Sequence, residues 1–275
     1  MITADPIFAA FAVDAGVDRI FIDTEILGKE DRQGHLNTVI SHHTIDDVVR
    51  VRPVVPAGRL LVRINPLHPG SGAEIDSVIA AGADILMLPM FRRPDEVSAF
   101  IQLVRGRAKC CLLMETVGAL ASFESWVDTP GIDEVHVGLN DLHLEQKLDF
   151  MFEPLVNGQI DGLAGALRER HIPFGIGGVA RVGEGTLPAE LVLTEHARLG
   201  STAAILSRAF VRHAATVQEI RQQTDLPAEL SKLRDAYDRC LHMSPDALSL
   251  AHQQVREKVQ AIAAHIRSSK AGHSA

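Results

Sequence analysis

Residues 110–119, CCLLMETVGA, and residues 131–142, GIDEVHVGLNDL, decide the fold, because each combines a short apolar strand with a carboxylate close behind it. The carboxylates are Glu115 and Asp141. In an α/β barrel the carboxyl ends of all strands open at one mouth, so we expect these two side chains to converge. Carboxylate oxygens are the ligands that hard divalent cations prefer. The pair therefore predicts a divalent-metal site at the mouth of a barrel.

Strand-like runs alternate with helix-like segments along most of the chain, which is the pattern of βα units around a parallel sheet. Residues 1–3 can supply a truncated eighth strand, because residues 6–13 after them have the apolar spacing of a helix. Glycines in the similar phrases AGVD at 15–18 and AGAD at 81–84 suit the turn from a helix into the next strand. Eight strands would close a (β/α)8 TIM barrel, the fold class that we expect for residues 1–210. The seven clear strands are expected at 19–23, 60–64, 84–88, 110–114, 134–137, 173–176 and 203–206.

Residues 211–275 are expected to form additional C-terminal helices that cap the barrel or join subunits of a homo-oligomer. The Asp-Leu-Pro and Ser-Pro sequences at 225–227 and 244–245 are typical of helix boundaries. The tail from residue 267 onward is expected to fray. The predicted helices cover residues 209–223, 228–242 and 245–266.

Composition excludes several classes of protein. The 275 residues, 46% of them hydrophobic, can build a large core, as one barrel or as two smaller domains. A formal net charge of −8 argues against nucleic acid as a partner, because such binders carry a clustered basic face. No apolar run approaches the roughly 18 residues of a membrane span, and the start of the sequence does not have the pattern of a signal peptide. We therefore expect a cytoplasmic protein without a membrane partner.

Polar side chains stand at four strand ends of the predicted sheet. One alone would be weak support for a site, because a carboxylate after a strand is more often a helix cap or a solvated loop residue. Four at equivalent positions predict a pocket at the barrel mouth. They are Asp23 and Glu25, Arg63 and Asn65, Glu115, and Asp141.

These motifs resemble the HpcH/HpaI aldolase and citrate lyase β-subunit family, within the pyruvate/phosphoenolpyruvate TIM-barrel superfamily. The resemblance covers roughly residues 1 to 210. Its most specific pieces are LLMET at 112–116 and VGLNDL at 137–142. Supporting pieces are FIDTE at 21–25, VRINP at 62–66 and GADILMLPM at 82–90.

The resemblance implies roles for individual residues. Glu115 and Asp141 match the family's ligands for Mg²⁺ or Mn²⁺, and Arg63 matches the arginine that contacts the keto or enolate oxygen of a pyruvate-like group. Glu25 would orient a metal-bound water or Arg63. The backbone amides of Asn140 and Asp141, where a helix is expected to begin, would suit a substrate carboxylate. The implied enzyme is a class II, metal-dependent aldolase: a carbon–carbon lyase acting on a small 2-oxo acid through a metal-bound enolate, with an unidentified polar acceptor.

Two departures from the family pattern concern proton transfer. Ile26 stands where the aldolases have a histidine after the acidic pair, and Leu113 stands where they have a glutamine. The polar stretch 28–43 could supply a replacement, with His35 as an acid or base and with Lys29 and Arg32 binding a phosphate or a second carboxylate. Alternatively, this stretch is a solvated loop without chemistry. His143 is a second candidate base, although a surface role is also open.

Two other functions fit the same departures. A CoA-ester lyase of the citrate lyase or malyl-CoA lyase type would explain the missing histidine, although no clear basic groove for CoA is visible in the sequence. A barrel that has lost its catalytic base could instead bind a small ligand without turnover. The retained Glu115, Asp141 and Arg63 count against this non-catalytic interpretation.

Overall fold

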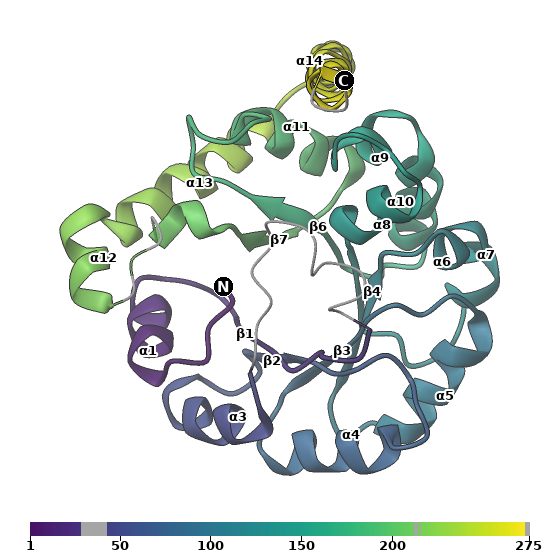
Figure 1. Cartoon of the computed structure of the whole chain (residues 1–275), viewed down its shortest axis with the longest axis vertical. Helices are drawn as coiled ribbons and strands as arrows, with labels where there is room; N and C mark the ends of the chain where they lie inside the picture. The colour runs from purple at the N-terminus through teal and green to yellow at the C-terminus, as the bar shows by residue number, and fades with distance from the viewer. Residues whose placement is uncertain (29–42, 212–213, 215, 273–275) are drawn as a thin grey trace.

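The computed structural model describes residues 1–28, 43–211, 214 and 216–272. At its centre lies one curled sheet of seven strands, and helices surround its outer face (Figure 1). The strands follow one another in chain order, and every neighbouring pair is parallel. Their bounds are β1 (Ile20–Asp23), β2 (Leu60–Arg63), β3 (Ile85–Leu88), β4 (Lys109–Met114), β5 (Glu134–Val137), β6 (Phe174–Val179) and β7 (Ala203–Leu206).

Both faces of the central strands are buried, which explains their nearly continuous apolar sequences. Because side chains alternate along a strand, one set points into the curl of the sheet and the other toward the helices. The large outer core joins strands and helices. The small inner cluster consists of Phe21, Leu61, Ile85, Met87, Cys111 and Leu113.

Seven predicted strands are confirmed, two of them, at 134–137 and 203–206, with the predicted bounds. β6 continues to Val179, past a register irregularity between Gly175 and Gly178 in its pairing with β7. Residues 1–3, which we expected to form an eighth strand, contribute only an isolated parallel bridge from Ile2 to Phe21. The described residues therefore form an open, TIM-barrel-like sheet of seven strands, where eight had been expected.

Helices connect successive strands on the outside of the sheet (Figure 1). Gly16 and Gly82 follow α1 and α4 with positive φ angles of 101° and 102°, as expected for glycines that turn a helix into a strand. The connecting helices are α1 (Pro6–Asp14), α3 (Ile45–Val51), the 3-10 turn η1 (Arg52–Val54), α4 (Ser71–Ala80), α5 (Pro94–Val104), α6 (Val117–Ala121), α7 (Phe123–Trp126), α8 (Leu139–Glu145), α9 (Glu153–Val156), α10 (Gln159–Glu169) and α11 (Ala189–Leu199).

A 3-10 turn and three helices follow the last strand: η2 (Arg208–Val211), α12 (Val217–Gln223), α13 (Leu226–Leu241) and α14 (Pro245–Gly272). The helix predicted from residue 209 begins only at Val217, where the Thr216 side chain caps its first turn. α13 packs on α11, and α14 packs on α11 and α9. Among the described residues, no helix is both long and apolar enough to pass through a membrane.

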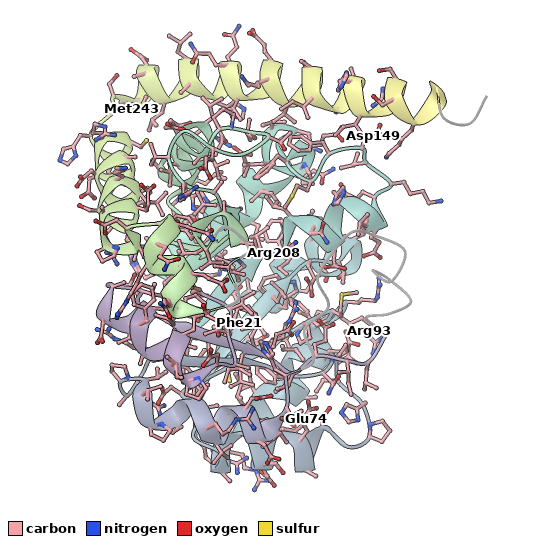
Figure 2. All side chains as sticks on the ribbon, turned by 60° about the vertical axis from the view of Figure 1, so that its left-hand side comes forward. Phe21, Glu74, Arg93, Asp149, Arg208 and Met243 are labelled. Carbon is pink, nitrogen blue, oxygen red and sulfur yellow. The ribbon has the colours of Figure 1, made fainter. Side chains whose placement is uncertain are left out.

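α14 continues to Gly272, so residues 267–272, which we expected to fray, are helical, whereas residues 273–275 lie outside the described residues. Arg267 Nε lies 2.7 Å from Asp149 Oδ2, and Lys270 Nζ lies 3.1 Å from Asp149 Oδ1. Figure 2 shows α14 crossing one side of the molecule, with Asp149 beneath its C-terminal half. The buried side chains of α14 are Ala251, Val255, Val259 and Ala263, whereas Leu250 is 59% exposed.

Candidate functional site

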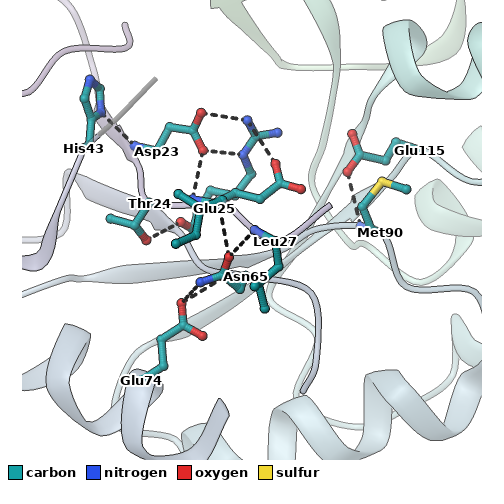
Figure 3. A network of polar contacts seen from close by, with 11 residues as sticks. Asp23, Thr24, Glu25, Leu27, His43, Asn65, Glu74, Met90 and Glu115 are labelled. Atoms are coloured by element: carbon teal, nitrogen blue, oxygen red, sulfur yellow. Dashed lines mark hydrogen bonds and ion pairs between the residues drawn. The ribbon is translucent and has the colours of Figure 1, made fainter. Parts of the chain in front are cut away.

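The strand ends bring the predicted polar residues together at one end of the sheet. Asp23 and Arg63 are the last residues of β1 and β2, Glu115 directly follows β4, and Asp141 lies in the first turn of α8. Figure 3 shows the Asp23, Glu25 and Glu115 carboxylates turned toward the same space. Parallel strands explain this convergence, since their carboxyl ends all lie on one side.

Arg63 is fixed by two neighbouring carboxylates. Its Nε and Nη2 each lie 2.8 Å from an oxygen of Asp23, in a bidentate pair, and Nη2 lies 3.4 Å from Glu25 Oε2. Burial alone lowers the pKa of Arg63, but the hydrogen bonds and charge of Asp23, with the charges of Glu25 and Glu115, raise it above its ordinary value. The guanidinium also stacks over the Phe21 ring at 5.7 Å. A permanent and well-oriented positive charge results.

Glu115 is a buried carboxyl group, only 3% exposed. Its Oε1 accepts a hydrogen bond of 3.2 Å from the backbone N–H of Met90. Burial raises the pKa of Glu115 most, Arg63 opposes the rise, and the charges of Asp141 and Glu25 add to it, which brings the pKa to about 8. The site therefore holds more negative charge than Arg63 alone balances.

Two backbone features that sequence reasoning missed shape the surroundings of Glu115. Met90 has a φ of 56°, which is uncommon for a residue with a side chain, and this conformation places its N–H beside the carboxylate. A Cβ at Gly138 would lie 2.7 Å from Glu115 Cβ and 2.8 Å from Oε2. A glycine between a strand and the predicted helix was a visible signal, whereas no sequence pattern indicates the Met90 conformation.

Asn65 anchors the segment that leaves β1. Its Oδ1 accepts hydrogen bonds of 2.9 Å from the backbone N–H groups of Ile26 and Leu27, and its Nδ2 donates to Glu74 Oε1 at 2.8 Å. The Ile26 side chain is 58% exposed. An apolar side chain thus stands where the aldolases carry a histidine, and Asn65 holds its backbone in place.

The other predicted residues have different outcomes. Asn140 and Asp141 lie in the first turn of α8, as expected for amides at a helix start. His143 Nδ1 contacts the Asn140 backbone carbonyl oxygen, and burial first of all lowers the pKa of this histidine. Lys29, Arg32 and His35 lie outside the described residues.

His43, at the end of the polar stretch 28–43, contributes a contact that was not predicted. Its Nδ1 accepts a hydrogen bond of 3.1 Å from the backbone N–H of Asp23, the residue that holds Arg63.

The donor set is chemically suited to a divalent cation. No cluster of three or more metal-ligating side chains occurs within the described ranges, so a cation would rely on two carboxylates and on water or substrate oxygens. Glu115 and Asp141 supply hard oxygen donors, and their mutual repulsion contributes to the raised pKa of Glu115. A cation between them would remove that repulsion. The residues present therefore fit Mg²⁺ or Mn²⁺.

Comparison with solved structures identifies the fold. The chain is similar to an HpcH/HpaI aldolase from Desulfitobacterium hafniense DCB-2, with a TM-score of 0.59, 13% identity and 88% and 91% of the two chains covered. It is also similar to an HpcH/HpaI aldolase/citrate lyase family protein from Burkholderia cenocepacia J2315, with a TM-score of 0.58, 15% identity, and coverage of 86% of this chain and 90% of the other. For the citrate synthase SbnG, the TM-score is 0.57 and the identity 14%, with 86% of this chain and 93% of that chain covered.

The sequence itself gives no comparable match. A scan against protein-family models finds none, and a search of the curated proteins also finds none. The α/β, TIM-barrel-like fold that the sequence motifs implied is nevertheless confirmed, with seven parallel strands and not the eight of a closed barrel. The chain has the TIM-barrel-like fold of HpcH/HpaI aldolase and citrate lyase family structures.

Proposed function

We propose that this protein is a divalent-metal-dependent carbon–carbon lyase that acts on a pyruvate-like 2-oxo acid. The observation that carries the proposal is the convergence of buried Glu115, Asp141 and the fixed guanidinium of Arg63 at the carboxyl ends of the strands. The shared fold with structures described as aldolases supports the same reaction class. Cleavage or formation of a bond next to a 2-oxo group needs a positive charge beside the developing oxyanion, and Arg63 supplies one.

Glu115 and Asp141 would hold Mg²⁺ or Mn²⁺, which when bound supplies Lewis acidity toward the oxygens of a 2-oxo acid. Arg63 is proposed to stabilise the negative charge that develops on the substrate's keto oxygen. Asp23 fixes the guanidinium through two hydrogen bonds, so little reorganisation is needed during the reaction. Glu25, 1% exposed and 3.4 Å from Arg63, adds to this orientation.

Substrate binding and proton transfer involve other parts of the mouth. We propose that the amides of Asn140 and Asp141 receive the substrate carboxylate, because N–H groups in the first turn of a helix lack intrahelical partners. Lys29 and Arg32 remain predicted contacts for the polar acceptor, and His35 remains the predicted acid or base. Ile26 and Leu113 cannot transfer protons, so the proton must move through a group other than those at these two positions.

The direct test is exchange of the pyruvate methyl protons in D₂O, followed by NMR with added Mg²⁺. Exchange reports removal of a methyl proton and needs no knowledge of the acceptor. We expect exchange by the wild-type protein, its loss after chelation with EDTA, and its recovery when Mg²⁺ is restored. Glu115→Gln removes the charge of one proposed ligand and should lower the exchange rate by at least about 100-fold, the scale of losing one major electrostatic contribution to catalysis.

Glu124→Gln is the matched control, because Glu124 is an exposed glutamate on α7. Its exchange rate should equal that of the wild type. Full exchange by Glu115→Gln would rule out the proposed site. Binding of Mg²⁺ without exchange in the wild type would favour a barrel that binds a ligand without turnover.

A further inference from the structure

A cavity lies on the opposite side of the inner cluster from the carboxylates. Its volume is about 490 Å³, within the range of small-molecule sites. Residues before or at the start of β1, β4, β5 and β7 line it, among them Arg19, Lys109, Glu134 and Thr202. The N-terminal ends of barrel strands usually serve stability and not catalysis, so this hollow does not belong to the site already described.

The walls of this cavity are mostly apolar. Side chains of the inner cluster, including Phe21 and Met87, line the end of the cavity that lies toward the carboxylates. At the N-terminal ends of the strands, Arg19 Nη1 lies 2.7 Å from both carboxylate oxygens of Glu134 and so links the start of β1 to the start of β5. In this pair the charges of Arg19 and Glu134 neutralise each other.

α13 forms the side wall where the sheet stays open. Among the described residues, β7 pairs only with β6, and its other edge faces the cavity. Leu230 and Leu233 of α13 line this side, and the Tyr237 hydroxyl donates a hydrogen bond of 2.8 Å to the Ser201 carbonyl oxygen. Strand β7 and helix α13 therefore both enclose the cavity on this side.

An unpaired polar atom of His196 is the observation that indicates a ligand. This α11 residue lines the cavity and is 2% exposed, and its Nδ1 lies 3.0 Å from Ser201 Oγ. Its Nε2 is buried and has no hydrogen-bond partner within the described residues. An unsatisfied buried polar atom costs about 1–3 kcal/mol, so such atoms call for an explanation.

The cavity favours an uncharged ligand. His136, at the inner wall, lies 3.1 Å through Nε2 from the Gly177 carbonyl oxygen, which accepts the hydrogen bond. Burial lowers the pKa of both His136 and His196 to about 4, so both rings are neutral near pH 7. A charged ligand would lose hydration against the mostly apolar walls. Arg19 pairs with Glu134 and Arg234 pairs with Asp18, and Lys109, which also lines the cavity, is an exposed residue whose charge water screens.

We infer that this cavity binds an uncharged small molecule with an apolar body and one hydroxyl group, which hydrogen-bonds to His196 Nε2. A hydroxyl both donates and accepts, so it satisfies either tautomer of the imidazole. The inference is independent of the proposed lyase activity, because none of its contacts includes Glu115, Asp141 or Arg63.

The chain offers a built-in probe for this site. Tyr237 is the only tyrosine and lines the cavity, whereas Trp126, the only tryptophan, packs edge-on against Phe91 elsewhere in the core. Phenol, titrated into the full-length protein, should shift the NMR signals of the Tyr237 ring saturably and leave those of the Trp126 indole unchanged. Fluorobenzene has nearly the same shape without the hydroxyl and should bind several-fold more weakly.

Two variants distinguish the contribution of the hydrogen bond to binding from that of the cavity volume. His196→Leu should weaken phenol binding about two- to tenfold, the effect of one neutral hydrogen bond, and leave fluorobenzene binding unchanged or stronger. Ala203→Leu adds bulk at an exposed β7 position whose side chain shares the inner face with Ile205, and it should weaken both probes together. Glu115→Gln should bind phenol as the wild type does, whatever its activity.

The inference is overturned if neither probe shifts Tyr237 saturably in the wild type, since the cavity then holds only water. An unchanged phenol affinity in folded His196→Leu would also overturn it. If that variant does not fold, two results decide the question: the preference of the wild type for phenol over fluorobenzene, and the weaker binding of both probes by Ala203→Leu. Equal binding of the two probes by the wild type would then count against the assigned hydrogen bond.

Discussion

At the scale of single residues, the site depends on how closely Gly138 approaches Glu115. The carboxylate fills the space that a side chain at position 138 would need, and the Met90 amide holds one of its oxygens. Position 138 is therefore restricted by steric contact with the carboxylate. The φ angle of −87° at Gly138 is open to any residue, so backbone strain does not explain the glycine.

Gly138→Ala should displace the Glu115 carboxylate and lower the Mg²⁺-dependent exchange of pyruvate protons at least tenfold. Overpacking also lowers the free energy of unfolding, by about 1–3 kcal/mol. Gly165→Ala is the matched control, because a Cβ there meets nothing within 4 Å on α10, and it should stabilise the protein by about 0.4–1 kcal/mol. Equal exchange rates in both variants would contradict the steric account.

His136 and His196 predict loss of stability in mild acid. Burial lowers the pKa of each to about 4, against 6.5 when unfolded, so the unfolded chain binds more protons between these values. Their contribution is therefore complete above pH 6.5 and is lost as pH falls toward 4. Glu134, Arg19 and Arg63 also act on His136, but burial dominates.

Urea unfolding at pH 7 and at pH 5 measures this effect. The wild-type free energy of unfolding should fall over that interval, and His196→Leu should reduce the fall by about 1–2 kcal/mol, because each pH unit contributes about 1.4 kcal/mol per proton bound. The same pH dependence in both proteins would show that His196 is not held neutral by the fold.

At the scale of secondary structure, apolar runs and helix boundaries sufficed for most elements. Strands such as 134–137 were predictable because both of their faces are buried, and helix starts such as Pro245 because proline fits a first turn. The continuation of α14 to Gly272 was not predictable, since its partner Asp149 lies more than 100 residues away in the sequence. In the candidate site, Glu115 and Arg63 were predictable from their positions at strand ends. The role of Met90 was not, because it depends on a backbone conformation that the local sequence does not indicate.

Asp149→Asn should release the last turns of α14 without unfolding the protein. The variant removes the charge that faces both Arg267 and Lys270, and an exposed pair of this kind contributes little to global stability. Hydrogen–deuterium exchange should accelerate after about residue 262, with an unchanged melting temperature. Asp128→Asn, which breaks the comparable surface pair with Arg170, should leave exchange in α14 unchanged.

At the scale of the whole molecule, the open sheet and the C-terminal helices belong together. A short strand at residues 1–3 was a reasonable expectation, but only Ile2 pairs with β1. α13 instead covers the side of the cavity beside β7, and Arg234 ties it to the beginning of the chain through hydrogen bonds of 2.5 Å to the Gly16 carbonyl oxygen and 3.1 Å to Asp18. Sequence periodicity reveals α13 as a helix but carries no information about which surface it covers.

The position of α13 sets the order in which the molecule can be completed during translation. The chain emerges from the ribosome N-terminus first, so all seven strands exist before residues 226–241 are made. Until then Phe21 and Met87 border an interior whose side wall is missing, and Arg234 must reach back 218 residues to Gly16. Such long-range closure is slow. The nascent protein therefore exposes apolar surface until residues 226–241 have been synthesised, and this is the interval in which it depends most on protection from aggregation.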